Sequence, residues 1–275
     1  MPSVSTPGKV TPSSMDVISE PRPASFIDGS VVYLKERTLN MLKNDLIQRN
    51  PLRFLGERNE NALAVGEFGG ILARAGVGKT ALIVQLAMNA MLKGHHVLHI
   101  SLTDPVNKVN LWYQEVYRHL TRGDDAAQVR TLWEQLLPHR FIMTFKAEGF
   151  RLPVLEERLG DLREQNIFTP SVIIMDGYPF EEAGRESLTA LKAFAAENGV
   201  RIWFTIRTHR HEAPDATGWP AHLAGLDDLF DVQVQLQPDR KAIHIDVLKG
   251  MENDAAPTTL YLDPTTMLIV DGRLS

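Results

Sequence analysis

Ala73-Arg74-Ala75-Gly76-Val77-Gly78-Lys79-Thr80 is the stretch that decides the fold. It follows the apolar pair Ile71-Leu72 and precedes residues 82–91, where apolar side chains recur with helical spacing. Strand, glycine-rich loop and helix therefore come in the order of a phosphate-binding loop. Gly76 and Gly78 permit backbone angles that aim successive N–H groups at phosphate oxygens, and the helix N-terminus adds partial positive charge.

Two side chains of this loop suit triphosphate chemistry. Lys79 would reach the β and γ phosphates, and the Thr80 hydroxyl would ligate Mg²⁺, so the expected cofactors are ATP and Mg²⁺. The usual pattern begins with Gly, and here the small residue Ala73 takes that place. The candidate nucleotide-binding residues are Ala73, Arg74, Ala75, Gly76, Val77, Gly78, Lys79, Thr80 and Ala81.

A second carboxylate for Mg²⁺ is expected at the end of a neighbouring buried strand. Residues 172–175 are four apolar residues, typical of a strand buried on both faces, and Asp176 follows them directly. An acid there lies at the carboxyl edge of the sheet, where open α/β sheets bind ligands. Thr80 and Asp176 are therefore the candidate metal ligands. The alternative is an Asp that only starts a turn before Gly177.

The rest of the chain alternates strand-like runs with amphipathic helical stretches, which predicts crossover units and a largely parallel sheet. Toward the C-terminus, apolar residues alternate with period two, which indicates antiparallel strands at one sheet edge. We therefore expect an α/β fold with a mostly parallel central sheet flanked by helices and antiparallel strands at the C-terminal edge. The expected strands are 71–72, 96–101, 141–145, 172–175, 202–205, 232–236 and 243–247, and the expected helices lie near 82–91, 109–120, 155–162 and 188–195.

Length and composition bound the organisation. The 275 residues suit one large domain, 61–275, preceded by a helical arm, 26–60, and a Ser- and Pro-rich tail, 1–25, expected to be disordered. The net charge of -5 gives no global attraction for nucleic acid, and the absence of cysteine excludes disulfides. No apolar run reaches the ~18 residues that span a bilayer. We expect a cytoplasmic protein without a membrane partner.

The segment Ile71 to Thr80 resembles the phosphate-binding loop of the RecA superfamily, particularly of the KaiC-type ATPases and the DnaB-type replicative helicases, where Arg often follows the first small residue. The resemblance extends over roughly residues 60–270. It implies a RecA-like domain that binds and hydrolyses ATP. It also implies assembly as a homo-oligomer, hexameric in some members, or with a protein partner.

The resemblance also implies roles for side chains at three further strand ends. In those families the strand after the loop helix ends in an acid that orients the attacking water. Here Thr103 stands in that place and Asp104 is the nearest carboxylate, with a helix cap before Pro105 as the alternative. Residues 202–207 look like the strand whose polar end senses the γ-phosphate, a role for Arg207 or Thr205 unless Arg207 is a plain surface residue.

Residues 247–251 look like the edge strand that, in hexameric members, sends a Lys-x-Arg pair to the neighbouring nucleotide. Lys249 fits the Lys, Met251 replaces the Arg, and a solvated Lys is the alternative. The departures at Thr103 and Met251 imply slow hydrolysis. The candidate catalytic residues are Lys79, Asp104, Asp176, Arg207 and Lys249.

The expected function is a Mg²⁺-dependent, slowly hydrolysing ATP-binding switch. A DNA-translocating helicase-type motor, a small-molecule kinase and a nucleotide-binding pseudo-ATPase stay open, although the acidic balance does not favour a nucleic-acid partner. Two histidine clusters, 95–96 and 209–211, have no carboxylate or Cys at ligand spacing, so metal binding through them is not favoured.

Overall fold

The computed structural model describes residues 29–50, 52, 63–209, 218–239, 242–250 and 259–272, without the side chains of 29–35. The predicted tail, 1–25, and Met251 lie outside these ranges. The chain divides into two compact units, 1–37 and 38–275. Helix α1 (Gly29–Arg49) begins in the first unit and ends in the second. In the second unit its apolar side chains Leu39, Leu42 and Leu46 are buried in the core.

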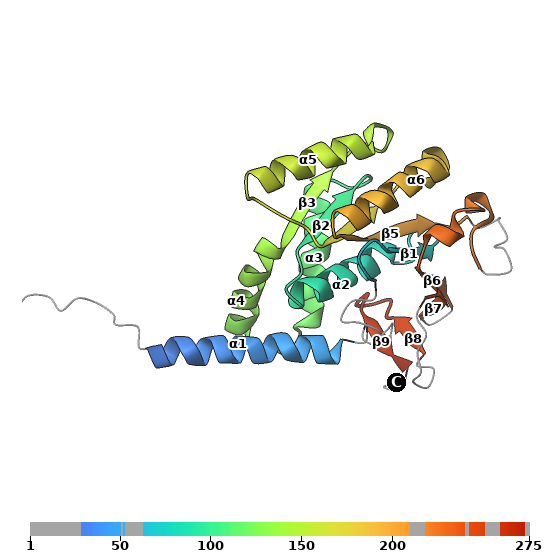
Figure 1. The fold of residues 1–275 in the computed structure, drawn as a ribbon. Coiled ribbons are helices and arrows are strands. Elements are labelled where there is room, and N and C mark those ends of the chain that lie inside the picture. The colour runs from blue at the N-terminus through green and yellow to red at the C-terminus, as the bar shows by residue number, and fades with distance from the viewer. Residues whose placement is uncertain are drawn as a thin grey trace, which may run out of the picture. The chain divides into compact units, whose positions relative to one another are not determined.

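The centre of the second unit is a nine-stranded sheet in the order β3-β2-β4-β5-β1-β6-β7-β8-β9 (Figure 1). Strands β1 to β6 pair in parallel, and β7, β8 and β9 continue the sheet by antiparallel pairing. This confirms the predicted α/β class, with a mostly parallel sheet and an antiparallel C-terminal edge. The strands are β1 (Phe68–Ala73), β2 (Val97–Ser101), β3 (Arg140–Thr144), β4 (Val172–Asp176), β5 (Arg201–Arg207), β6 (Val232–Pro238), β7 (Ile243–Lys249), β8 (Leu260–Leu262) and β9 (Ile269–Asp271).

Helices cover both faces of the sheet. Figure 1 shows α5 and α6 on one side and α2 and α3 on the other. Among the described helices, none combines the length and apolar character needed to cross a bilayer. The helices after α1 are α2 (Lys79–Leu92), α3 (Val106–Leu120), α4 (Ala126–Leu136), α5 (Leu152–Glu164) and α6 (Phe180–Glu197), with short 3₁₀ turns at η2 (Leu137–His139), η3 (Ala147–Gly149), η4 (Ala221–Leu223) and η5 (Asp227–Leu229).

Strand β4 shows how the sequence produces two cores. Its side chains alternate between the faces of the sheet. Val172 and Ile174 pack in the core that contains α2 and α3, while Ile173 and Met175 pack in the core that contains α5 and α6. All five positions of β4 are buried, as its continuous apolar run predicts.

Helix α4 was not expected from the sequence. Asp125 caps its N-terminus by accepting hydrogen bonds from the backbone N–H groups of Ala127 and Gln128, at 3.1 and 3.0 Å. Only Leu132 and Leu136 on this helix are buried. Val129 and Trp133 also pack against the core, so apolar residues recur at helical spacing and the sequence carries both a periodic and a capping signal for this helix.

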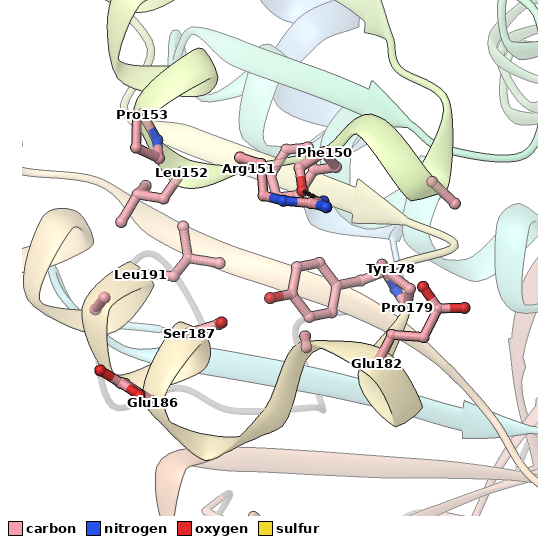
Figure 2. Close-up of a pocket in the computed structure, with 13 residues that line it drawn as sticks. Phe150, Arg151, Leu152, Pro153, Tyr178, Pro179, Glu182, Glu186, Ser187 and Leu191 are labelled. Carbon is pink, nitrogen blue, oxygen red and sulfur yellow. Dashed lines mark hydrogen bonds between the residues drawn. The ribbon is translucent and has the colours of Figure 1, made fainter.

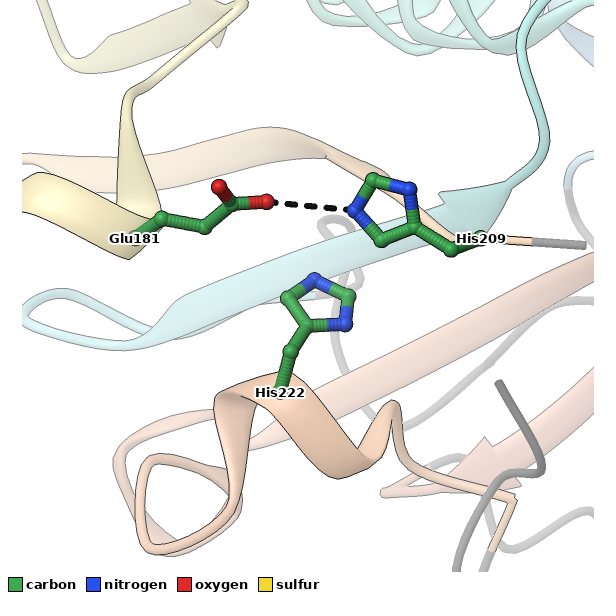
Figure 3. Close-up of side chains that lie close together, drawn as sticks. All are labelled: Glu181, His209 and His222. Atoms are coloured by element: carbon green, nitrogen blue, oxygen red, sulfur yellow. Dashed lines mark hydrogen bonds and ion pairs between the residues drawn. The ribbon is translucent and has the colours of Figure 1, made fainter. Parts of the chain in front are cut away.

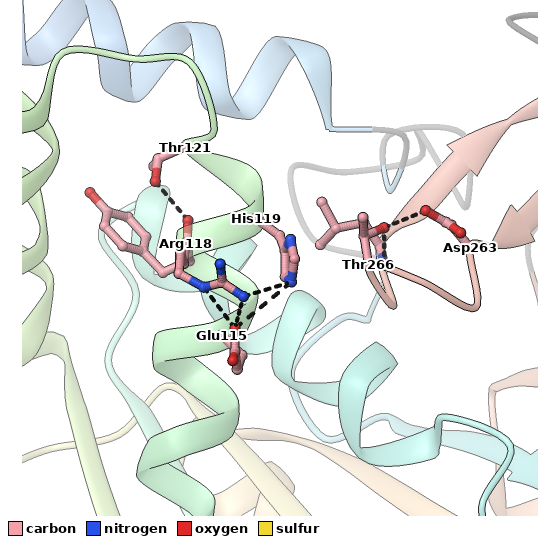
Figure 4. A network of polar contacts seen from close by, with 8 residues as sticks. Glu115, Arg118, His119, Thr121, Asp263 and Thr266 are labelled. Carbon is pink, nitrogen blue, oxygen red and sulfur yellow. Dashed lines mark hydrogen bonds and ion pairs between the residues drawn. The ribbon is translucent and has the colours of Figure 1, made fainter.

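The hairpin of β8 and β9 packs against the start of α2 through one buried amide. Gln85 Nε2 donates to the Met267 carbonyl at 2.7 Å, and the backbone N–H of Ile269 donates to Gln85 Oε1 at 2.9 Å. The turn of this hairpin is closed by Asp263, which accepts hydrogen bonds from backbone and hydroxyl groups of the turn that lower its carboxyl pKa (Figure 4). Figure 4 also shows Arg118 on α3 donating to Glu115.

We expect Gln85→Leu to destabilise the protein by about 2 kcal/mol, because the two backbone groups of the hairpin lose their partner in a buried place. The measurement is urea unfolding of the variant and the parent. Gln114→Leu, on the exposed side of α3, is the matched control and should change stability by less than about 0.5 kcal/mol. Equal midpoints for Gln85→Leu and the parent would show that the amide does not hold the hairpin.

Candidate functional site

The loop between β1 and α2 needs glycine at two positions. Gly76 and Gly78 have φ angles of 76° and 110°, in the region that side-chain-bearing residues rarely adopt. A Cβ atom on Gly78 would also lie 2.5 Å from Leu262 Cδ2, so the Leu262 side chain of the β8–β9 hairpin would have to shift to admit a larger residue. The predicted order of strand, glycine loop and helix is the order in the structure.

The side chain of Lys79 folds back over this loop. Its Nζ donates to the carbonyl oxygens of Ala73 and Arg74, at 2.8 and 2.9 Å. Burial lowers the pKa of Lys79 to about 8, an effect that Asp176 opposes and Arg207 reinforces. Both hydrogen-bond acceptors are uncharged, so the loop itself does not cancel the ammonium charge.

Asp176 ends β4 as a buried carboxylate with two hydroxyl donors. Thr205 Oγ1 donates to its Oδ1 at 2.6 Å, and Thr80 Oγ1 donates to its Oδ2 at 3.3 Å. Burial raises the pKa of Asp176, and the two hydroxyl hydrogen bonds and Lys79 act in the opposite direction. The two predicted metal ligands are thus in direct contact, and their oxygen donors are the kind that Mg²⁺ prefers.

The strand order explains why these residues meet. Strand β5 lies between β1 and β4, so the carboxyl ends of all three strands share one edge of the sheet. Thr205 on β5 is buried, and its hydroxyl accepts from the Gly177 N–H at 3.0 Å while it donates to Asp176. Thr205 therefore orients the Asp176 carboxylate, and Arg207 closes the same strand as an exposed residue.

A cavity of about 400 Å³ is lined by Ala75, Lys79 and Thr80 of the predicted nucleotide-binding loop and by Asp176. It brings together the ammonium of Lys79, the guanidinium-bearing Arg207 and the buried carboxylate of Asp176. We call it the phosphate pocket, after the ligand that the sequence predicts for it. Its lining residues are Ala75, Lys79, Thr80, Thr103, Asp176, Gly177, Tyr178, Pro179, Phe180, Glu181, Glu182, Thr205, Arg207, His222 and Leu223.

Two predicted catalytic residues, Asp104 and Lys249, do not line the phosphate pocket. Thr103 lines it, whereas the Asp104 carboxylate pairs with Lys108 Nζ at 2.8 Å. Asp104 does not cap α3 either, because the cap position is Pro105. Lys249 ends β7, and its Nζ donates to the Asp227 carbonyl at 3.1 Å.

A second cavity, of about 550 Å³, lies between α5 and α6 (Figure 2). It shares Tyr178, Pro179 and Glu182 with the phosphate pocket, so the two cavities adjoin. Arg151 stands in its wall and donates to the Phe150 carbonyl at 2.7 Å. Sequence reasoning missed this cavity, because it forms only where two separate helices pack.

Comparison of the chain with protein-family models and with curated proteins gives no match. The functional assignment therefore rests on the motif and on the geometry of the phosphate pocket.

Proposed function

We propose that the chain is a Mg²⁺-dependent ATP-binding protein with slow hydrolysis, built on a RecA-like domain. One observation carries this proposal: Lys79 and the Thr80–Asp176 pair meet in one cavity at the end of a glycine loop. A basic residue or an acid alone would not bring an ammonium group and a hydroxyl–carboxylate pair into one cavity. Backbone N–H groups of the loop and the N-terminus of α2 supply the remaining positive potential for phosphate oxygens.

The electrostatics of the pocket favour a ligand that carries both a cation and negative charge. Burial raises the pKa of Asp176, so its ionised form is costly without a bound cation. A bound Mg²⁺ would offset that cost, and Lys79 would neutralise charge on the β and γ phosphate oxygens. Asp176 cannot neutralise the phosphate charge and Lys79 cannot bind the cation. We therefore expect Mg²⁺ and ATP to bind together.

We expect slow hydrolysis because of Thr103, which lies two residues beyond the end of β2. Thr103, which lines the pocket, carries no carboxylate to orient a water molecule, and Asp104 is paired with Lys108. A long-lived triphosphate state suits a switch better than a motor. Assembly with further copies of the chain, with Lys249 as a cation acting in trans, and a cytoplasmic location belong to the same proposal.

The adjoining cavity between α5 and α6 favours a second candidate, phosphoryl transfer to a small acceptor (Figure 2). Its position beside Tyr178 and Glu182 gives an acceptor a place next to the phosphate pocket. Product analysis separates the two candidates, since hydrolysis releases inorganic phosphate and transfer does not.

The direct test is calorimetric titration of the full chain with ATP and ADP, with Mg²⁺ or with EDTA, followed by turnover measurements. We expect one ATP per chain, an affinity that falls by roughly tenfold or more without Mg²⁺, and turnover on the order of 10⁻² s⁻¹ or slower. Absence of binding by any nucleoside triphosphate would refute the proposal. Strong stimulation of ATP turnover by single-stranded DNA would instead support the helicase-type motor.

A further inference from the structure

Three side chains with metal-binding atoms meet beside the phosphate pocket (Figure 3). Glu181 lies in the first turn of α6, His209 follows β5, and His222 lies in η4. One donor atom from each lies within 4.8 Å of the others. Figure 3 shows the three side chains pointing toward one another from three separate segments.

We propose that Glu181, His209 and His222 form a binding site for a divalent transition-metal ion, with Zn²⁺ as the ion that fits best. Two imidazoles and one carboxylate are a common zinc ligand set, which leaves a fourth position for water or another ligand. The site is separate from the Mg²⁺ site of Thr80 and Asp176, whose ligands are oxygen atoms alone.

The geometry is close to that of a loaded site. His209 Nε2 lies 3.1 Å from Glu181 Oε1, and the two imidazole rings have centroids 4.7 Å apart at an interplanar angle of 66°. Around a tetrahedral Zn²⁺ with bonds of about 2.0–2.1 Å, neighbouring ligand atoms lie roughly 3.3 Å apart. Glu181 and His209 are exposed and His222 is half-buried, so side-chain rotation can move the donors from within 4.8 Å of one another toward that spacing.

The sequence could not reveal this ligand set. In the sequence, the cluster that includes His209 has no carboxylate at ligand spacing, so the sequence alone does not favour metal binding there. The fold supplies the missing ligands from a distance, since Glu181 lies 28 positions from His209. His222 comes from beyond residues 210–217, which lie outside the described part of the chain.

The position of the cluster gives the ion a role in anion binding. Glu181 and His222 also line the phosphate pocket, together with the acidic residues Asp176 and Glu182. An unneutralised Glu181 carboxylate would repel a phosphate there, and a bound dication would reverse the sign of the local charge. This coupling rests on the proposed function, whereas metal binding itself does not.

The test is a titration of the full chain, stripped of metal and free of nucleotide, with Zn²⁺ alone in competition with a chromogenic chelator. We expect one site per chain with a Kd on the order of 1 µM or tighter. Glu181→Gln, His209→Asn and His222→Asn should each weaken binding by roughly tenfold or more, since each removes one of only three protein ligands.

His244→Asn is the matched control. His244 also faces a carboxylate, with its Nε2 3.7 Å from Asp239 Oδ2, but among the described residues no third potential metal ligand groups with this pair. We expect this variant to bind Zn²⁺ as the parent does, and all four variants to keep the parent's circular dichroism. No stoichiometric binding by the parent would overturn the site. So would equal losses in His244→Asn and the three ligand variants, because that pattern describes nonspecific surface binding.

Discussion

Lys79→Ala is expected to weaken ATP binding by about 100-fold, which corresponds to roughly 2.7 kcal/mol of binding free energy. The substitution removes the ammonium group that lies over the loop, and neither the Ala73 nor the Arg74 carbonyl can attract a phosphate in its place. The fold should survive, since this side chain contributes hydrogen bonds at a partly exposed place and not core packing. Calorimetry with ATP and Mg²⁺ measures the loss.

The pH dependence of binding identifies the group that acts. Because burial lowers the pKa of Lys79 to about 8, the parent's ATP affinity should be full below that pH and decline above it, as the ammonium loses its proton. Lys79→Ala should lack this decline. Lys43→Ala, which removes one positive charge from α1, is the control and should keep both the affinity and the decline. Equal affinity in folded Lys79→Ala and the parent would refute the phosphate-binding assignment.

The elements that the sequence predicts are those whose signals are local. The run from Val172 to Met175 is apolar throughout and ends in an acid, so both the strand and its buried carboxylate follow from adjacent residues. The glycine loop is equally local, because its backbone angles depend on Gly76 and Gly78. Each of the seven predicted strands overlaps an observed one. Helix α4, which was not expected, carries local signals too: a cap at Asp125 and apolar residues at helical spacing from Val129 to Leu136.

The predicted pairing of Thr80 with Asp176 joins residues 96 positions apart, and it could be anticipated because parallel strand ends share one edge. No such rule predicts where side chains on loops will meet. The Glu181–His209–His222 cluster depends on how the segments after β5 fold back toward α6. The roles of Asp104 and Lys249 come from the resemblance alone. Both residues lie outside the phosphate pocket, and each side chain bonds to a neighbouring group there.

Asp176→Asn is expected to separate Mg²⁺ binding from the fold. An amide can keep the hydrogen bonds with Thr205 and Thr80, since its oxygen accepts and its nitrogen donates. It cannot supply the negative charge that a hard cation requires. We therefore expect the parent's ATP affinity to fall roughly tenfold or more when EDTA replaces Mg²⁺, and the variant's affinity to change by less than about twofold.

The same substitution should raise the stability of the ligand-free protein at neutral pH. Burial raises the pKa of Asp176 in the folded state, so the ionised carboxylate destabilises the fold. This penalty is absent below the unfolded-state pKa, grows as pH rises between the two pKa values, and is complete above the folded-state pKa. The variant's advantage in urea unfolding should therefore be present at pH 7 and disappear at about pH 3.

Asp161→Asn, an exposed acid on α5 that pairs with Arg158, is the matched control and should change neither property. The two readouts for Asp176→Asn give different information when they disagree. A gain in stability with Mg²⁺ titrations that overlay those of the parent would make Asp176 a buried structural acid and move the metal site elsewhere. Loss of Mg²⁺ dependence without a gain in stability would mean that Lys79 and the two threonine hydroxyls already compensate the buried charge when no cation is bound.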